Sequence, residues 1–67
     1  MTRIDARGLR CPWPAIRLAR ALREGEGPVE LTADDPAAPR ELAAVAAAAG
    51  ASFAADPVDP SCFRIRS

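Results

Sequence analysis

Apolar and polar residues follow two kinds of spacing along the first half of the chain. Residues 2–6 form a short strand candidate that ends at the turn-prone Arg-Gly pair. Residues 12–23 predict a helix, because apolar side chains recur there at i, i+3, i+4 and i+7, namely Ala15, Leu18, Ala19 and Leu22. Residues 29–33 (VELTA) alternate apolar and polar positions, which predicts a strand with one buried face.

The second half predicts another helix and two more strands. After the turn DDPAAP, a second helical stripe is made by Leu42, Val45, Ala46 and Ala49. Asp34 or Asp35 is the expected N-cap of this helix, and Glu41 is expected in or near its first turn, where the helix dipole favours an acid. Pro39 should lie early in the helix and Gly50 just after its end. Residues 51–55 and 61–66 are strand candidates joined by DPVDP, whose prolines favour a turn.

The predicted order is therefore β-α-β-α-β-β. A strand-helix-strand unit implies a parallel pair with a right-handed crossover, and the last two strands can form a hairpin. We expect an α/β two-layer sandwich, with a mixed four-stranded sheet and both helices on one face, forming a single domain over residues 1–67. The expected core is Ile4, Leu9, Ile16, Leu18, Leu22, Val29, Leu31, Leu42, Val45, Phe53, Val58, Phe63 and Ile65, with alanines between them.

Composition excludes several classes of function. Nine arginines, no lysines and nine acidic residues give zero net charge, and aromatic residues are few, which argues against nucleic-acid binding. No apolar run approaches the length of a membrane span, and the N-terminus does not resemble a signal peptide, so a cytoplasmic location and reduced thiols are expected. Without histidine there is no Ser-His or Cys-His pair, and two cysteines cannot supply the usual zinc site. We expect no cofactor or metal, and chemistry that rests on a thiol.

Cys11 is the candidate thiol. Proline is favoured at the first helical position, so Pro12 should be N1 and Cys11 the N-cap or its immediate neighbour. The helix N-terminus offers partial positive charge and unpaired N–H groups, and Arg7 and Arg10 lie close in sequence. Such surroundings lower the pKa of a cysteine and favour the nucleophilic thiolate. The alternative is a small buried hydrophobe at a turn.

Trp13 is the next residue of interest. On a helical wheel it shares a face with Arg17, Arg20 and Glu24, opposite the apolar stripe, which is a composition typical of a docking surface. The alternative is that Trp13 folds back over the edge of the core. Asp5, like the pair Asp34 and Asp35, is interpreted as a turn residue that accepts backbone N–H bonds.

Cys62 alternates with Phe63 and Ile65 in the last strand, so it should face away from the helices. This placement and the cytoplasmic expectation favour a free thiol over a Cys11–Cys62 disulfide.

The runs DARGLRCPWP and TADDPAAPREL resemble the TusA/SirA family of small sulfur-carrier proteins. The family signature is an acid, a Gly-Leu-x-Cys-Pro-x-Pro run that opens the first helix, and an Asp-Asp-Pro turn that opens the second. The resemblance implies that Cys11 carries sulfane sulfur as a persulfide. It assigns the motif loop and thiolate support to Asp5, Gly8, Leu9, Arg10, Pro12 and Pro14, partner docking to Arg7, Trp13, Arg17 and Arg20, and the second-helix turn to Asp34, Asp35 and Pro36.

The resemblance also implies protein partners. The donor would be a cysteine desulfurase or a rhodanese-like protein, and the acceptor a protein of tRNA thiolation, molybdenum-cofactor assembly, sulfur oxidation or thiosulfate uptake. A monomer is expected, without direct nucleic-acid binding or membrane insertion. Cys62 is not part of the family signature, and no feature of the sequence selects one pathway. The alternative function is a non-catalytic interaction or regulatory module of the same fold.

Overall fold

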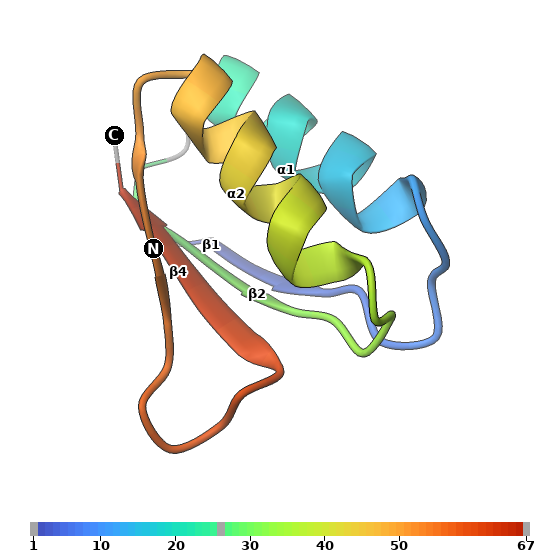
Figure 1. The fold of residues 1–67 in the computed structure, drawn as a ribbon. Coiled ribbons are helices and arrows are strands. Elements are labelled where there is room, and N and C mark those ends of the chain that lie inside the picture. Colours follow the sequence, from blue (N-terminus) through green and yellow to red (C-terminus); the bar gives the residue numbers. More distant parts are fainter. Residues whose placement is uncertain (1, 26, 67) are drawn as a thin grey trace.

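The computed structural model, which describes residues 2–25 and 27–66, shows two helices packed on one face of a four-stranded sheet (Figure 1). The elements follow the predicted order and are β1 (Thr2–Asp5), α1 (Trp13–Arg23), β2 (Val29–Thr32), α2 (Ala38–Ala48), β3 (Ser52–Ala55) and β4 (Cys62–Arg66). The predicted two-layer α/β fold is therefore confirmed.

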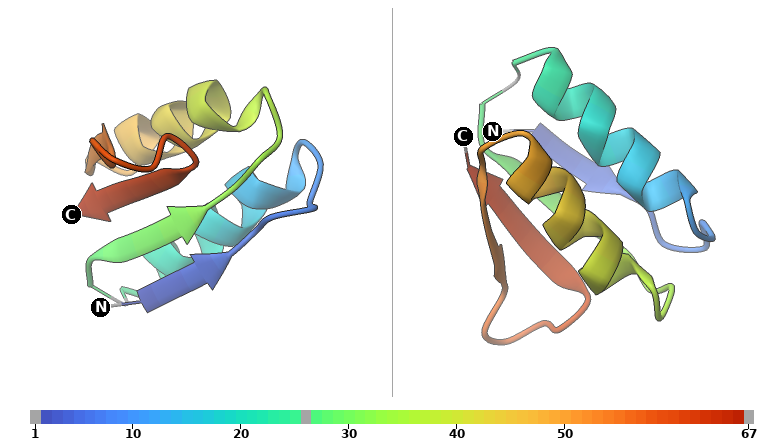
Figure 2. Two further views of the ribbon diagram at one scale, coloured as in Figure 1. Left: turned by 90° about the horizontal axis from the view of Figure 1, so that it is seen from below. Right: turned by 45° about the horizontal axis from the view of Figure 1, so that its top comes forward.

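The sheet has the strand order β1-β2-β4-β3. β1 and β2 are parallel, with Ile4 opposite Leu31, whereas β4 is antiparallel to both β2 and β3. Because β1 and β2 are parallel, the chain leaves both at the same edge of the sheet and enters α1 and α2 there. The starts of the two helices consequently lie at one end of the molecule (Figure 2).

The core lies between the helices and the sheet. The alternation predicted for β2 is confirmed, since Val29, Leu31 and Ala33 are all buried. From the other elements the core receives Leu18, Ala21, Ala38, Leu42, Ala46, Phe63 and Ile65. Phe63 also stacks on Phe53, with ring centroids 5.4 Å apart. Alanines occupy several of the buried positions between the larger side chains, as expected.

Two residues predicted for the core are exposed. Ile16 is 48% exposed, because it lies off the stripe of α1 that faces the sheet. Val58 is 89% exposed, because it belongs to the connection between β3 and β4 and not to a strand.

The start of α1 differs by one residue from the prediction. Pro12 is the N-cap and not N1, so Cys11 is the N-cap's neighbour, one of its two predicted places. Pro14 occupies the first turn and is buried. It fits there because the first N–H groups of a helix have no intrahelical partner and a proline lacks that group.

The start of α2 corrects a second prediction. Neither Asp34 nor Asp35 is the N-cap, which is Ala37. The carboxylate of Asp35 instead accepts the N–H of Ala37 at 3.1 Å, and its carbonyl accepts the N–H of Ala38. These bonds close an Asx-type turn before the helix, which moves the helix start beyond both acids.

The end of α2 agrees with prediction. Gly50 follows the C-cap Ala49 and has a φ of 72°, which glycine adopts without a steric penalty. The N–H groups of Gly50 and Ala51 donate to the carbonyls of Ala47 and Ala46. This is the Schellman pattern, which satisfies carbonyls at the helix end. In the described residues no helix is both long and apolar enough to cross a membrane.

Candidate functional site

Two turns meet where β1 and β2 end. The first is the motif loop, residues 6–12, and the second is the turn of residues 33–37. The N–H of Gly8 donates to Asp34 Oδ1 at 3.0 Å, a contact between residues 26 positions apart that joins the turns. Clefts outside the carboxyl ends of parallel strands are common ligand and reaction sites. Here the two turns and the starts of both helices gather candidate residues at this edge.

Asp5 holds the first part of the motif loop. Its carboxylate accepts the backbone N–H of Arg7 at 3.1 Å and both Nε and Nη2 of the same arginine at 3.0 Å. Asp5 is the last residue of β1 and, as predicted, accepts a backbone N–H of the turn that follows. These bonds lower the pKa of Asp5 to about 2. Arg7 therefore directs its charge to Asp5.

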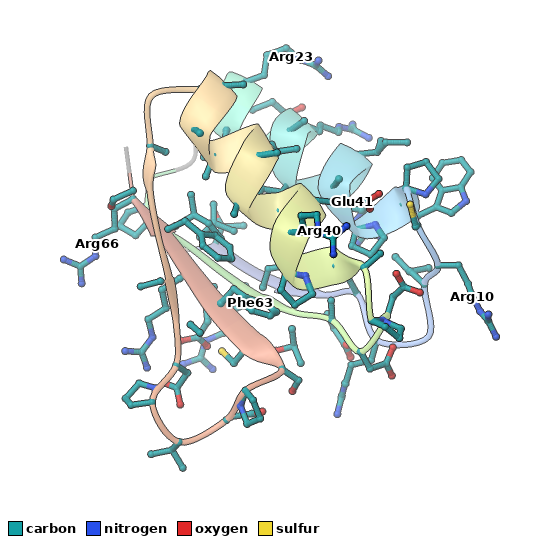
Figure 3. The ribbon with its side chains drawn as sticks, viewed as in Figure 1. Arg10, Arg23, Arg40, Glu41, Phe63 and Arg66 are labelled. Atoms are coloured by element: carbon teal, nitrogen blue, oxygen red, sulfur yellow. The ribbon has the colours of Figure 1, made fainter. Side chains whose placement is uncertain are left out.

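Gly8, Leu9 and Arg10 form the part of the motif loop that leads to Cys11. Gly8 has a φ of 82°, a left-handed conformation that other residues rarely adopt. Leu9 then packs against the core, which anchors the loop. Arg10 is exposed, and its side chain points outward from the loop (Figure 3).

Cys11 is an exposed, free thiol. The alternative of a buried cysteine is therefore wrong. Cys11 Sγ donates a hydrogen bond to Oε2 of Glu41, at 2.6 Å. The two residues are 30 positions apart and meet because α2 starts beside α1. In Figure 3 the side chain of Glu41 projects from the first turn of α2.

The pKa of the Cys11 thiol is raised, contrary to the prediction that it is lowered. The causes, in order, are the hydrogen bond to Glu41, the loss of water around Sγ, and the negative charges of Glu41 and Asp35. The arginines that were expected to favour the thiolate do not oppose these causes, since Arg7 binds Asp5 and Arg10 points outward. The causes that raise the pKa of Cys11 therefore come from the acidic start of α2 and from the loss of water.

Sequence reasoning missed Glu41 as a site residue. It recognised Glu41 only as an acid near a helix start, which the structure confirms. The carboxylate is partly buried, and its Oε1 atom is fully buried with no hydrogen-bond donor among residues 2–25 and 27–66. The predicted parallel strand pair indicated that the starts of the two helices lie side by side, and therefore that residues of the second helix lie near Cys11. It could not identify Glu41 as the residue in contact.

The predicted docking face of α1 is exposed. Trp13 is 57% exposed, which answers the question left open by the sequence, and Arg17 and Arg20 are exposed with it. Ile16 adds an exposed apolar side chain that sequence analysis assigned to the core. We call Trp13, Ile16, Arg17 and Arg20 the docking patch.

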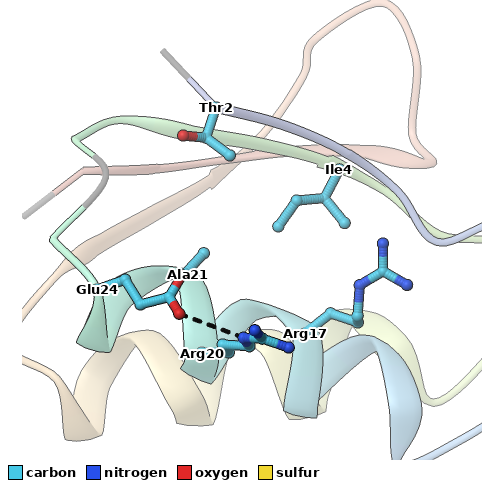
Figure 4. Close-up of a pocket in the computed structure, with 6 residues that line it drawn as sticks. All are labelled: Thr2, Ile4, Arg17, Arg20, Ala21 and Glu24. Atoms are coloured by element: carbon cyan, nitrogen blue, oxygen red, sulfur yellow. Dashed lines mark hydrogen bonds and ion pairs between the residues drawn. The ribbon is translucent and has the colours of Figure 1, made fainter.

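A surface groove adjoins the docking patch. It runs between α1 and the edge strand β1 and is lined by Thr2, Ile4, Arg17, Arg20, Ala21 and Glu24 (Figure 4). Arg20 Nε lies 3.3 Å from Glu24 Oε2, so this arginine is paired along the helix. The groove continues the exposed face of α1 down to the sheet edge.

The second-helix turn lines a smaller depression. Asp34, Asp35 and Pro36 form one side, and Gly8, Leu9 and Arg10 of the motif loop form the other. Within the described ranges, no three His, Cys, Asp or Glu side chains lie close enough to hold a metal ion.

Cys62 differs from Cys11 in its burial. It is buried and free, and it pairs in register with Thr32 of β2. Phe63 and Ile65 lie in the core, so strand alternation places Cys62 on the sheet face away from the helices. The predicted free thiol is confirmed, and the Cys11–Cys62 disulfide does not form.

Comparison with known proteins agrees with these features. The family model described as Sulfurtransferase TusA matches residues 2–66. The crystal structure of the SirA-like protein from Desulfitobacterium hafniense is 32% identical, with a TM-score of 0.80, and the match covers 97% of this chain and 92% of that chain. No curated protein matches the sequence. The chain belongs to the TusA sulfurtransferase family, and this membership supports a general role as a sulfur carrier.

Proposed function

We propose that the protein carries sulfane sulfur as a persulfide on Cys11 and relays it to a cysteine of a partner protein. The observation that carries the proposal is the exposed free thiol at the meeting point of the two turns. A carrier must expose its reactive atom to two different proteins in succession. An open edge suits this task better than an enclosed pocket.

The reaction is a transfer of one sulfur atom between thiols. Cys11 attacks the terminal sulfur of a donor persulfide, a new S–S bond forms at Sγ, and the S–S bond of the donor breaks. The donor cysteine leaves as a thiol, and Cys11 loses its proton. In the second step a partner thiol attacks the terminal sulfur, and Cys11 is released as a thiol. No external oxidant or reductant is needed, because each S–S bond broken is replaced by another.

The motif loop and the second-helix turn hold the thiol for this transfer. Asp5 closes the first turn, Gly8 bonds to Asp34, and Leu9 anchors the loop on the core. Pro12 and Pro14 restrict the backbone at the start of α1. The remaining residues assigned to these turns are Arg10, Asp35 and Pro36. Together they fix the direction in which Sγ is presented.

Partner proteins would bind next to the thiol. TusA family proteins act with partners in sulfur relay. We assign docking to the exposed docking patch on α1, with Arg7 and Arg10 at its border. Aromatic and arginine side chains are the residues most enriched at binding hot spots.

The expected donor is a cysteine desulfurase or a rhodanese-like protein. The acceptor belongs to tRNA thiolation, molybdenum-cofactor assembly, sulfur oxidation or thiosulfate uptake, in the cytoplasm, and residues 1–67 act as one monomeric domain.

The test is a sulfur-loading assay read by mass spectrometry. The protein is incubated with a cysteine desulfurase and cysteine, or with a rhodanese and thiosulfate. The wild type should gain one sulfur, which a reductant removes, and Cys11→Ser should gain none. Cys62→Ser is the matched control and should load like the wild type, because Cys62 is buried.

Two results would contradict the proposal in different ways. A sulfur adduct that persists in Cys11→Ser would show that another residue carries the sulfur. A wild type that gains no sulfur, yet binds a partner through Trp13 whether or not Cys11 is present, would instead support the non-catalytic interaction module.

A further inference from the structure

The hydrogen bond between Cys11 and Glu41 places a carboxylate beside the reactive thiol. The Glu41 carboxylate is the group in direct hydrogen-bond contact with Sγ, at 2.6 Å, and it comes from the other helix. The chain has no histidine, so the side chain most often used for proton transfer is missing. Glu41 is within the distance at which a base can take the proton of a thiol.

The charges around Cys11 keep its proton in place in the free protein. Those that act on the thiol are Glu41, from the first turn of α2, and Asp35, from the turn before it, and both raise the pKa of Cys11. At neutral pH the free carrier therefore holds a thiol. The thiolate is the nucleophile in sulfur chemistry, so this proton must leave Sγ when Cys11 attacks.

The surroundings of Glu41 suit a group that exchanges one proton. Oε2 accepts the thiol, while Oε1 is buried and has no donor in the described part of the chain. Moving the proton from Sγ to Glu41 transfers one negative charge by a single hydrogen-bond length and leaves the charge of the pair unchanged. Both positions lie at the start of a helix, where the dipole favours negative charge. A docked partner that excludes water would therefore not prevent the transfer.

We propose that Glu41 is a catalytic residue of the sulfur transfer, which takes the Cys11 proton as Sγ attacks the donor and returns a proton to Sγ as Cys11 is released. The inference rests on the proposed function of Cys11. In loading, the S–H bond of Cys11 breaks, an O–H bond forms on Glu41, and the donor thiolate takes this proton as it leaves. In unloading, Glu41 receives the proton of the acceptor thiol and gives it to Sγ.

The test compares Glu41→Gln with the wild type in two measurements. The first is the rate of single-turnover loading from a purified rhodanese that has been preloaded with thiosulfate. We expect about a 100-fold slower loading of Glu41→Gln at pH 7, within the range of a lost proton-transfer group. The second is the pH dependence of Cys11 alkylation by iodoacetamide. Both proteins carry Cys62→Ser in this measurement, so that Cys11 is their one cysteine. The midpoint of alkylation should move to lower pH in Glu41→Gln, because the negative acceptor is gone.

Glu41→Gln should thus load sulfur more slowly although its Cys11 thiol ionises more easily. A purely structural role of Glu41 would not produce this combination. The ratio of the two loading rates, which cancels the pH dependence of the donor, should approach one above the pKa of the thiol, where no proton has to leave. Glu41→Asp keeps a carboxylate and should recover loading to within about tenfold of the wild type. Glu30→Gln is the matched control on β2 and should load normally. Thermal melts establish that each variant is folded.

Two outcomes overturn the inference. If the wild type loads and Glu41→Gln loads equally fast or faster at pH 7, Glu41 is not the proton acceptor, and the proposed function of Cys11 stands. If the wild type gains no sulfur, the proposed function fails and the inference fails with it.

Discussion

The two cysteines of this protein lie in two regions that use their acidic residues differently. The connection of residues 56–61 precedes Cys62, and the motif loop with the turn of residues 33–37 surrounds Cys11. Both contain aspartates next to prolines and both accept backbone N–H groups. One ends in a buried thiol and the other in an exposed thiol.

In the connection before Cys62, both aspartates accept several hydrogen bonds. Asp56 Oδ2 accepts the N–H groups of Val58 and Asp59, and Asp56 Oδ1 lies 2.9 Å from Arg64 Nη2. Asp59 Oδ1 accepts both the hydroxyl and the N–H of Ser61. These bonds lower the pKa of both carboxyl groups. The acids here stabilise a turn.

Beside Cys11, the acid Glu41 has one carboxylate oxygen that accepts no hydrogen bond from the described residues. Glu41 accepts the Cys11 thiol with one oxygen and has a buried second oxygen without a donor in residues 2–25 and 27–66. The thiol pKa rises instead of falling. Buried polar groups are normally paired, so an unpaired one marks a position where structure alone does not account for the residue. The comparison teaches that acidic side chains bonded to backbone N–H groups close a turn in one place, whereas an acid bonded to a thiol leaves one oxygen without a donor in the other.

The largest expected effect comes from removing a core side chain of β4, on the sheet face opposite to Cys62. Phe63→Ala should lower the free energy of unfolding by about 3–5 kcal/mol, because it deletes a buried aromatic ring and leaves a cavity. That is much of the stability of a domain this small. Urea denaturation followed by circular dichroism measures the change. Val58→Ala, at an exposed position in the same hairpin, should change it by less than about 0.5 kcal/mol. A loss below about 1 kcal/mol for Phe63→Ala would contradict the packing described for β4.

The next effect is the difference in reactivity between the two thiols. In the native protein, iodoacetamide should modify Cys62 about 100-fold more slowly than Cys11, because Cys62 reacts only after local opening of the sheet. Peptide mass spectrometry over time measures both rates in one sample. In concentrated urea the rates should converge. Equal rates under native conditions would mean that Cys62 is not protected and would remove the contrast between the turns.

The smallest effect is the pH dependence of stability, to which the aspartates and Cys11 contribute with opposite signs. Asp56 and Asp59 have lowered pKa values, so their stabilisation is present above the ordinary carboxyl pKa of about 3.9 and is lost as the pH falls below it. Asp5, with a pKa of about 2, contributes in the same direction. Cys11 has a raised pKa, so its contribution is present below the ordinary thiol pKa and is lost as the pH rises through the raised value.

Urea midpoints between pH 2 and pH 10 measure these contributions. Asp56→Asn should lose less stability in acid than the wild type does, and Cys11→Ser should lose less in alkali. If Asp56→Asn kept the full acid dependence of the wild type, the hydrogen bonds of Asp56 would not be the source of its part of that dependence.

Much of the fold could be predicted because each element carries its own local signal. The alternation of VELTA, the helical stripe of α2 and the glycine after it depend on residues a few positions apart, and all three agree with the structure. The exact helix starts were less predictable. At Pro12 and at Asp35 a turn and a cap use the same residue types, and only the backbone path decides between them.

The sequence by itself determined the order of elements, the parallel strand pair, the motif thiol as the candidate and the family to which the chain belongs. The tertiary structure alone decided the surroundings of that thiol. The bond between Gly8 and Asp34 and the contact between Cys11 and Glu41 join residues 26 and 30 positions apart. Such contacts depend on how two turns and two helices pack over the sheet, which no local spacing encodes. The sign of the Cys11 pKa shift follows from that packing, because its largest cause is a hydrogen bond to a residue of the neighbouring helix.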